Sequence, residues 1–309
     1  MNTPAFSPVF FSDLRFALRQ LRKTPAFTLS VVLTLALGIG ATTAIFSLVN
    51  AVLLSPLPFP HSNRLMALTA LNQENAAGPA IVPDDSSYPG FFDWRARNHS
   101  FSFIGTFGDE KFLLNSPDGS AEQVDGGVVS AEAFRALGVA PILGRDFVRA
   151  DEAKGNHNVL LSYALWQRSY AGSRDLVGKT IQLNNEPWTV VGVMPKNLAF
   201  PLSDADTPFW VTFGHIDTGP NSEVEQRGWQ DLDAIVGRLK PGVTREQAEA
   251  EMTAIQRNIS REHVTTDKLT TAVRVQPGLE IWVGDQARPL RLLFGAVCCL
   301  LLIACTNVA

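Results

Sequence analysis

Apolar residues are concentrated at the two ends of this chain, and they alternate with polar residues in the region between. From residue 24 to residue 63 there is no Asp, Glu, Lys or Arg, and residues 28–54 read TLSVVLTLALGIGATTAIFSLVNAVLL. As a helix this segment would extend about 40 Å, which exceeds the roughly 30 Å hydrocarbon core of a bilayer. The pattern therefore predicts a transmembrane helix over 28–54 that crosses with tilt or protrudes on one side.

A cleaved secretory signal is the alternative for this segment, because it also combines a basic start with an apolar middle. Signal sequences have apolar cores of about 7–15 residues. Here the apolar run continues well past the small residues at 41–44 that could imitate a cleavage site. We therefore favour an uncleaved helix.

A second apolar run, LLFGAVCCLLLIACTNVA, occupies residues 292–309 and contains 18 uncharged residues. A spanning helix needs about 20 residues. We expect residues 290–309 to be the start of a second transmembrane helix, truncated because the chain is a fragment of a longer protein. A short C-terminal tail anchor is the alternative. All three cysteines lie in this run, where we expect small apolar packing residues and no metal or redox site.

The region between the two apolar runs alternates strand and helix patterns, which is typical of a mixed α+β domain. We expect strands at residues 64–71, 123–129, 159–161, 180–183, 188–193, 231–239 and 271–275. We expect helices after Ser87, after Ser130 as far as Gly138, over 163–170 and after Thr244.

Two local motifs make this reading specific. Asn184-Asn185 between two strand patterns predicts a tight hairpin turn. Thr244 and Gln247 have the spacing of a capping box, and the helix that they begin carries an apolar stripe. The stripe consists of Ala248, Met252, Ile255 and Ile259.

Charge is distributed very unevenly, although the whole chain has a formal net charge of only −4. Residues 1–27 have a net charge of +3, whereas residues 55–289 have 21 basic and 29 acidic side chains, a net charge of −8. Basic residues before a span predict a cytoplasmic N-terminus and an external domain from residue 55 onward. The composition excludes a disordered chain and a basic nucleic-acid module.

Residues 1–27 predict a basic amphipathic helix that begins near Ser12. Its polar side carries Arg15, Arg19, Arg22 and Lys23. We expect it to lie along the cytoplasmic lipid headgroups, with a cytoplasmic protein partner as the alternative.

Inside the first apolar run, Ala36, Gly40 and Ala44 recur every four residues on one helix face. Small residues at this spacing allow close approach of another membrane helix. We therefore predict a helix-packing face, and the absence of any dedicated partner is the alternative.

Motifs for chemistry are weak throughout the sequence. Residues 173–180, SRDLVGKT, resemble a phosphate-binding loop, but Ser173 replaces the first glycine and the segment leads into a predicted strand. The five histidines are dispersed and show no metal-binding spacing. We predict no catalytic residue, no cofactor and no metal site.

Several longer segments resemble FtsX-like permeases of the MacB type, and especially the duplicated orphan permeases named after acidobacteria. The resemblance is carried by DLRFALRQLRKTPAFT from residue 13, LTLALGIGATTAIFSLVNAVLLSPLPFP from 33, FFDWRARNHSF from 91, VSAEAFRALGVAPILGRDF from 129, VLLSYALWQRSY from 159, IQLNNEPWTVVGVMP from 181, VGRLKPGVTREQAEAEM from 236 and the ending LLLIACTNVA. Thr42 stands where the family pattern leads us to expect Asn, and Ala26 where we expect Gly.

The resemblance implies a membrane-anchored periplasmic mixed α/β domain with two lobes, placed between one transmembrane helix and a truncated second one. One lobe would comprise about 61–130 plus 229–284, and the inserted lobe about 131–228. It further implies a location in the bacterial inner membrane. The expected partners are membrane lipid, the remaining permease helices and a separate ABC ATPase, and no nucleic acid is expected.

Three functions remain open from the sequence. The leading hypothesis is a non-enzymatic part of an ABC-type permease that transmits conformational change from the ATPase to the periplasmic lobes and does not function alone. A complete membrane-anchored periplasmic binding or scaffold protein is the second, and an anchored hydrolase is the third.

Overall fold

A computed structural model of the chain describes residues 25–50, 57–72, 83–84, 87–116, 119–196, 198, 207–216, 227, 232, 234–265, 270–279 and 287–308. The chain forms two compact units. One consists of residues 1–55 and 283–309, and the other is Pro56–Trp282. The predicted basic residues Arg15, Arg19, Arg22 and Lys23 lie outside the described residues.

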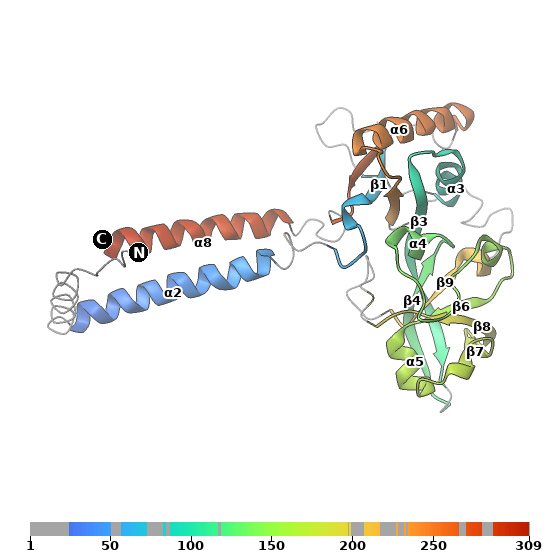
Figure 1. The fold of residues 1–309 in the computed structure, drawn as a ribbon, viewed down its shortest axis with the longest axis horizontal. Coiled ribbons are helices and arrows are strands. Elements are labelled where there is room, and N and C mark those ends of the chain that lie inside the picture. Colours follow the sequence, from blue (N-terminus) through green and yellow to red (C-terminus); the bar gives the residue numbers. More distant parts are fainter. Residues whose placement is uncertain are drawn as a thin grey trace, which may run out of the picture. The chain divides into compact units, whose positions relative to one another are not determined.

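The first unit contains two apolar helices, α2 (Pro25–Val49) and α8 (Ala287–Val308), which lie side by side (Figure 1). Both are long and apolar enough to span a membrane, over Thr28–Val49 and Pro289–Thr306. They run antiparallel, because Gly38 lies close to Leu301 and Ala304, whereas the Phe46 ring lies 6.2 Å from that of Phe294. The predicted first span ends at residue 54, and its last four residues lie outside the described part.

Along α2 the less exposed residues recur mostly in steps of three and four, so they form one face of the helix. This face packs against α8, and we call it the seam. Its residues are Thr28, Val31, Leu35, Gly38, Ala41, Thr42, Ile45 and Val49. A Cβ at Gly38 would lie 3.3 Å from Leu301 Cδ1, so glycine allows close packing at the middle of this seam.

The second unit is built on one mixed sheet with the strand order β11-β1-β10-β3-β4-β9-β6-β8-β5. Its strands are β1 (Leu65–Asn72), β2 (Pro83–Asp84), β3 (Phe101–Asn115), β4 (Ala121–Val129), β5 (Leu143–Gly144), β6 (Asn158–Leu161), β7 (Thr180–Leu183), β8 (Glu186–Val193), β9 (Phe209–Thr212), β10 (Ala234–Leu239) and β11 (Thr270–Pro277). Its α-helices are α3 (Tyr88–Arg97), α4 (Ala133–Leu137), α5 (Tyr163–Tyr170) and α6 (Arg245–Glu262). Short 3-10 helices are η2 (Ser62–Arg64), η3 (Arg149–Glu152), η4 (Arg174–Leu176) and η5 (Phe213–His215).

The long strand β3 joins two lobes of this sheet. We divide the sheet into a first lobe with β1, β2, β10, β11, α3 and α6, and a second lobe with β4 to β9, α4, α5 and the 3-10 helices η3 to η5. Residues Phe101 to Phe107 of β3 pair with β10, and Phe107 to Asn115 pair with β4. Strand β7 pairs with both β8 and β3, which closes a ring of six strands in the second lobe, β3-β4-β9-β6-β8-β7. The lobe boundaries predicted from the sequence stay a prediction, since the two lobes form a single compact unit.

Several local predictions are confirmed. Thr244 and Gln247 form the capping box of α6 through hydrogen bonds of 3.0 and 3.2 Å. Asn184 and Asn185 form the two-residue turn between β7 and β8, with φ of 52° and 63°. Gly138 ends α4 with φ of 73°, a left-handed conformation that glycine adopts without a steric penalty.

One predicted helix start is wrong, and two strands were missed. Ser130 does not cap α4, because its Oγ accepts a hydrogen bond from the Thr106 amide of β3 at 3.1 Å. The helix begins at Ala133 instead, and its N-cap residue Glu132 makes no side-chain cap bond. Strands β3 and β9 were not predicted at all, although both lie in the middle of the sheet.

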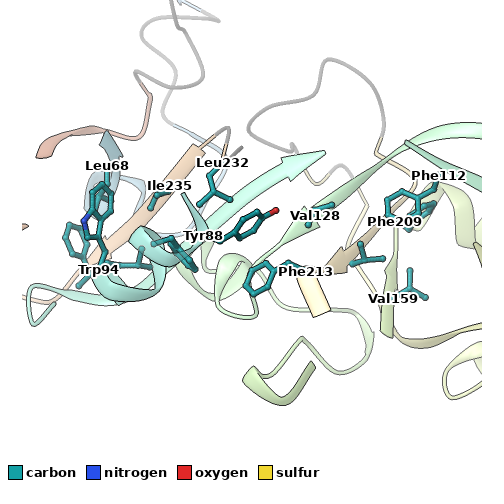
Figure 2. Close-up of a cluster of buried hydrophobic side chains, with 14 of the residues drawn as sticks. Leu68, Tyr88, Trp94, Phe112, Val128, Val159, Phe209, Phe213, Leu232 and Ile235 are labelled. Atoms are coloured by element: carbon teal, nitrogen blue, oxygen red, sulfur yellow. The ribbon is translucent and has the colours of Figure 1, made fainter. Parts of the chain in front are cut away.

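Two apolar clusters lie on opposite faces of the sheet, because neighbouring strand residues alternate between them. On β4, Val128 belongs to the first cluster and Val129 to the second. The first cluster extends through both lobes, from Leu68 and Trp94 to Phe112 and Phe209 (Figure 2). The second cluster surrounds α4.

Candidate functional site at the two chain connections

The segment through which the chain enters the domain after α2 is fixed on the second apolar cluster. Leu57 and Phe59 are 9% and 6% exposed, and they pack in the cluster that contains Leu65 and Phe107. Their burial stabilises the attachment by roughly 1.5–3 kcal/mol per side chain. Leu57 and Phe59 are therefore part of the domain core.

The segment that leaves the domain toward α8 ends on the same cluster. The Gly278 amide donates a 2.8 Å hydrogen bond to the Leu65 carbonyl, and Leu279 packs against the cluster with its side chain partly buried. Both chain connections are thus attached to one apolar cluster. We call the set formed by Leu57, Phe59, Arg64, α4, Arg238, Gly278 and Leu279 the joint.

Helix α4 is the central element of the joint. Its residues Ala133, Phe134, Ala136 and Leu137 are all fully buried. Gly105 of β3 makes this packing possible, since a Cβ there would lie 2.4 Å from the Ala133 Cα. The helix therefore rests directly on the strand that joins the two lobes.

Arg238 of β10 binds both α4 and the incoming segment through one buried guanidinium group. Its Nε donates to the Ala136 carbonyl at 2.8 Å, and its Nη1 donates to the carbonyls of Pro60 at 2.7 Å and His61 at 3.3 Å. Burial, together with the nearby Arg64 cation, lowers the Arg238 pKa. This single side chain connects the first lobe, the C-terminal end of α4 and the incoming segment.

Arg64 attaches the incoming segment to the end of β10. Its Nε donates to the Leu239 carbonyl at 2.8 Å, and its Nη2 donates to the same oxygen. Two arginines therefore hold the segment between residue 57 and β1 against the end of β10.

The loop that follows β5 also contacts α4, through residues 146 and 147. Arg135 of α4 donates to the Phe147 carbonyl at 2.8 Å and lies 3.7 Å from the Asp146 carboxylate. Burial raises the Asp146 pKa to about 6, against the opposing effects of the Phe147 amide, Arg135 and Arg145. The charge of the Asp146 carboxyl group therefore changes near pH 6.

Asp151 fixes the far end of the same loop. Burial alone would raise its pKa, but hydrogen bonds from Arg145, the Val148 amide and Asn158 outweigh burial, so the pKa is lowered. Arg145 binds it in a bidentate manner at 2.6 and 3.0 Å. Asp151 is thus ionised and holds the loop in place.

The predicted packing residues Ala36, Gly40 and Ala44 are all exposed on α2. At 100° per residue they lie on the side of the helix opposite the α8 seam. A Cβ at Gly40 would meet no atom within 4 Å. Their role against a further helix stays a prediction.

Two histidines that are far apart in the sequence lie against the same tryptophan. The ring centres of His157 and His215 lie 4.6 and 5.4 Å from the indole of Trp188. Among the described residues, no group of three or more His, Cys, Asp or Glu side chains is arranged to hold a metal ion. Nothing in the spacing of the histidines could have predicted their proximity.

Arg238 was not predicted as a functional residue, although the sequence around it carries one signal. It is the only charged residue of the otherwise apolar strand AIVGRL, in which every residue is buried. A cation inside such a run needs partners in the core. The identity of those partners could not be read from the strand itself.

Residues 28–255 match the family described as the MacB-like periplasmic core domain. Among curated proteins, the macrolide export ATP-binding/permease proteins MacB 1 of Yersinia pestis and of Yersinia pseudotuberculosis are 29% identical over 126 residues. That alignment covers 40% of this chain and 18% of each relative, so the matched segment is less than one fifth of their length.

Two solved structures are similar in fold. The periplasmic region of MacB from Actinobacillus actinomycetemcomitans aligns with a TM-score of 0.47 at 13% identity and covers 70% of this chain and 90% of that one. The extracellular domain of the noncanonic ABC-type transporter YknZ from Gram-positive bacteria gives the same TM-score and identity, with 69% and 99% coverage.

Proposed function

Because this chain belongs to the family of MacB-like periplasmic core domains, we propose that it is part of an ABC-type permease subunit that transmits conformational change between a cytoplasmic ATPase and its periplasmic lobes. The family supports a membrane-anchored periplasmic domain in such a permease. The cytoplasmic N-terminus, the separate ATPase subunit and the dependence on further permease helices are parts of the proposal.

The observation that carries this proposal is the convergence of both chain connections on the joint. Chains of packed and hydrogen-bonded groups that have two arrangements can carry coupling between distant sites. Here Leu57 and Phe59 lie in the domain core, and Arg238 binds the carbonyls of Pro60 and His61 directly. A displacement of the incoming segment is thereby passed to α4 and to β10, and so to both lobes.

The opposite face of α2 extends the proposal into the membrane. We assign Ala36, Gly40 and Ala44 to contact with another permease helix, while the Gly38 face packs on α8. Arg15, Arg19, Arg22 and Lys23 are assigned to the cytoplasmic lipid surface, in keeping with their charge. No catalytic, cofactor or metal role is proposed for any residue.

Orientation is tested by labelling single cysteines in a variant whose Cys298, Cys299 and Cys305 are changed to Ser. A cysteine replacing Arg257, which is exposed on α6, should react with a membrane-impermeant maleimide added to intact spheroplasts. A cysteine replacing Arg22 should react only after lysis. The reverse pattern would show that the proposed orientation is wrong.

Transmission is tested in complexes purified from membranes of the source organism through an affinity tag on this protein. An ABC ATPase should copurify, and hydrogen exchange in residues 57–72 should differ with and without ATP. Arg238→Lys keeps the charge but cannot reproduce the forked contacts, so it should abolish the difference. Lys240→Met, at an exposed position just after β10, is the matched control and should preserve it.

The alternative is a complete membrane-anchored periplasmic binding or scaffold protein. It predicts that no ATPase copurifies and that ATP changes no exchange rate in residues 57–72. Those two results together would replace the transmission proposal.

A further inference from the structure

A buried ion pair joins the two lobes on the side of α3. Arg95 of α3 donates from Nη1 to both carboxylate oxygens of Glu152, at 2.7 and 2.8 Å. Glu152 is the last residue of η3 in the second lobe. The two side chains are only 13% and 8% exposed, so the contact is largely shielded from water.

Aromatic packing surrounds this ion pair. The Arg95 guanidinium lies 5.3 Å from the ring centre of Phe91 and 5.1 Å from that of Phe92, both on α3. Tyr88 and Phe92 each pack edge to face on Phe213 of η5 at 5.4 Å, and Figure 2 shows Tyr88 and Phe213 beside one another. Helix α3 therefore contacts two separate segments of the second lobe, η3 and η5.

Glu152 also reaches the segment that leads into α4. Its Oε1 accepts a 2.7 Å hydrogen bond from the Ala131 amide, in addition to the bond from Arg95. One carboxylate thus connects α3 of the first lobe to the segment that immediately precedes α4. Arg95 contacts Glu152 and Glu152 contacts Ala131, so Arg95 acts on Ala131 through the carboxylate.

Neighbouring charges do not replace this contact. Arg97, two residues along α3, pairs with Glu262 of α6 and with Asp93, and all three residues belong to the first lobe. Glu132 pairs with Arg149 inside the second lobe. Of these ion pairs only Arg95–Glu152 crosses between the lobes.

We infer that Arg95 and Glu152 form an interlobe lock that fixes the second lobe and the start of α4 to α3, so that the domain is displaced as one rigid body. Removing one partner of a buried pair leaves an uncompensated charge, which is why the lock is sensitive to single substitutions. The continuous strand β3 and the shared first apolar cluster form the rest of the connection. The lock itself is argued from the contacts alone. That it lets the domain transmit motion as one body rests on the proposed function.

The first test is hydrogen exchange of the full chain in lipid nanodiscs. Arg95→Met should accelerate exchange in residues 131–137 by about tenfold or more, although Arg95 does not touch them, because Glu152 loses its partner. Arg97→Met removes an ion pair from the same helix and should leave that peptide unchanged. Equal exchange of residues 131–137 in the Arg95 and Arg97 variants would overturn the lock.

The second test measures an interlobe distance in a chain whose three native cysteines are changed to Ser. Spin labels are attached to cysteines that replace Arg257 of α6 and Arg174 of η4, both exposed. The distribution of distances between the two labels should be narrow in the parent chain and in Arg97→Met. It should broaden in Glu152→Gln, which keeps the shape of the side chain and therefore remains informative if Arg95→Met fails to fold. A parent distribution as broad as that of Glu152→Gln would overturn the inference. Neither test requires an ATPase, so failure of the lock and failure of the proposed transmission are distinguishable.

Discussion

Arg238 and Ala136, which are 102 positions apart in the sequence, are joined by a 2.8 Å hydrogen bond from the guanidinium Nε to the carbonyl oxygen. The bond attaches the C-terminal end of α4 to β10. Since the same guanidinium binds the carbonyls of Pro60 and His61, the chain that arrives from α2 is held at the same point. The stability of this arrangement can be measured directly.

Arg238→Met should destabilise the domain, because the Ala136 and Pro60 carbonyls lose their Arg238 donor. The His61 carbonyl keeps the Arg64 amide as a donor at 3.0 Å. We expect a cost of about 1–3 kcal/mol, partly offset because the buried cation is also removed. The thermal unfolding midpoint of the purified chain measures the effect, with Lys240→Met as the control at an exposed position. An unchanged midpoint in Arg238→Met would show that the contacts make no net contribution.

Gly105→Ala should displace α4. The new Cβ would lie 2.4 Å from the Ala133 Cα, a backbone atom that cannot rotate away. We expect a loss of about 1–3 kcal/mol and faster hydrogen exchange in residues 133–137. Gly90→Ala of α3 is the control, because its Cβ would meet only the Ser87 hydroxyl, at 3.3 Å. Equal stabilities of the two variants would contradict the packing of α4 on β3.

Asp146→Asn should change how stability depends on pH. The folded pKa of about 6 lies above the ordinary value of 3.8, so the folded state retains a proton that the unfolded state releases. Stability from this group is therefore greatest below pH 4 and falls as the pH rises to about 6. The variant lacks this loss. The difference between its unfolding midpoint and that of the parent chain should therefore grow from pH 4 to pH 6 and then stay constant. Asp125→Asn, at an exposed position, is the control, and a pH-independent advantage would contradict the prediction.

Gly38→Leu should separate α2 from α8 in the membrane, because Leu301 and Ala304 occupy the space beside Gly38. Cross-linking of cysteines that replace Phe46 and Phe294, in a chain without the three native cysteines, measures the pairing. The yield should fall several-fold, since a bulky side chain prevents close helix approach. Gly40→Leu should leave the yield unchanged, because a Cβ there meets nothing within 4 Å. A fall with Gly40→Leu alone would show that the other face forms the pair.

Features that depend on neighbours in the sequence were predicted well. The capping box at Thr244, the Asn184-Asn185 turn and the helix stop at Gly138 require contacts over only a few residues. In contrast, β3 contains Gly105, Gly108 and a run of three charged residues, which resemble a turn. It is a strand because β10 and β4 pair with it along its two halves.

The sequence by itself determined the two apolar helices, the mixed domain between them and the resemblance to a permease family, because composition, periodicity and turn chemistry are local properties of the chain. Only the tertiary structure decided the joint and the interlobe lock. Arg95 and Glu152 are 57 positions apart, and no local pattern selects which carboxylate a buried cation will meet. Such partners are fixed when the sheet and helices pack, since burial then makes an unpaired charge costly.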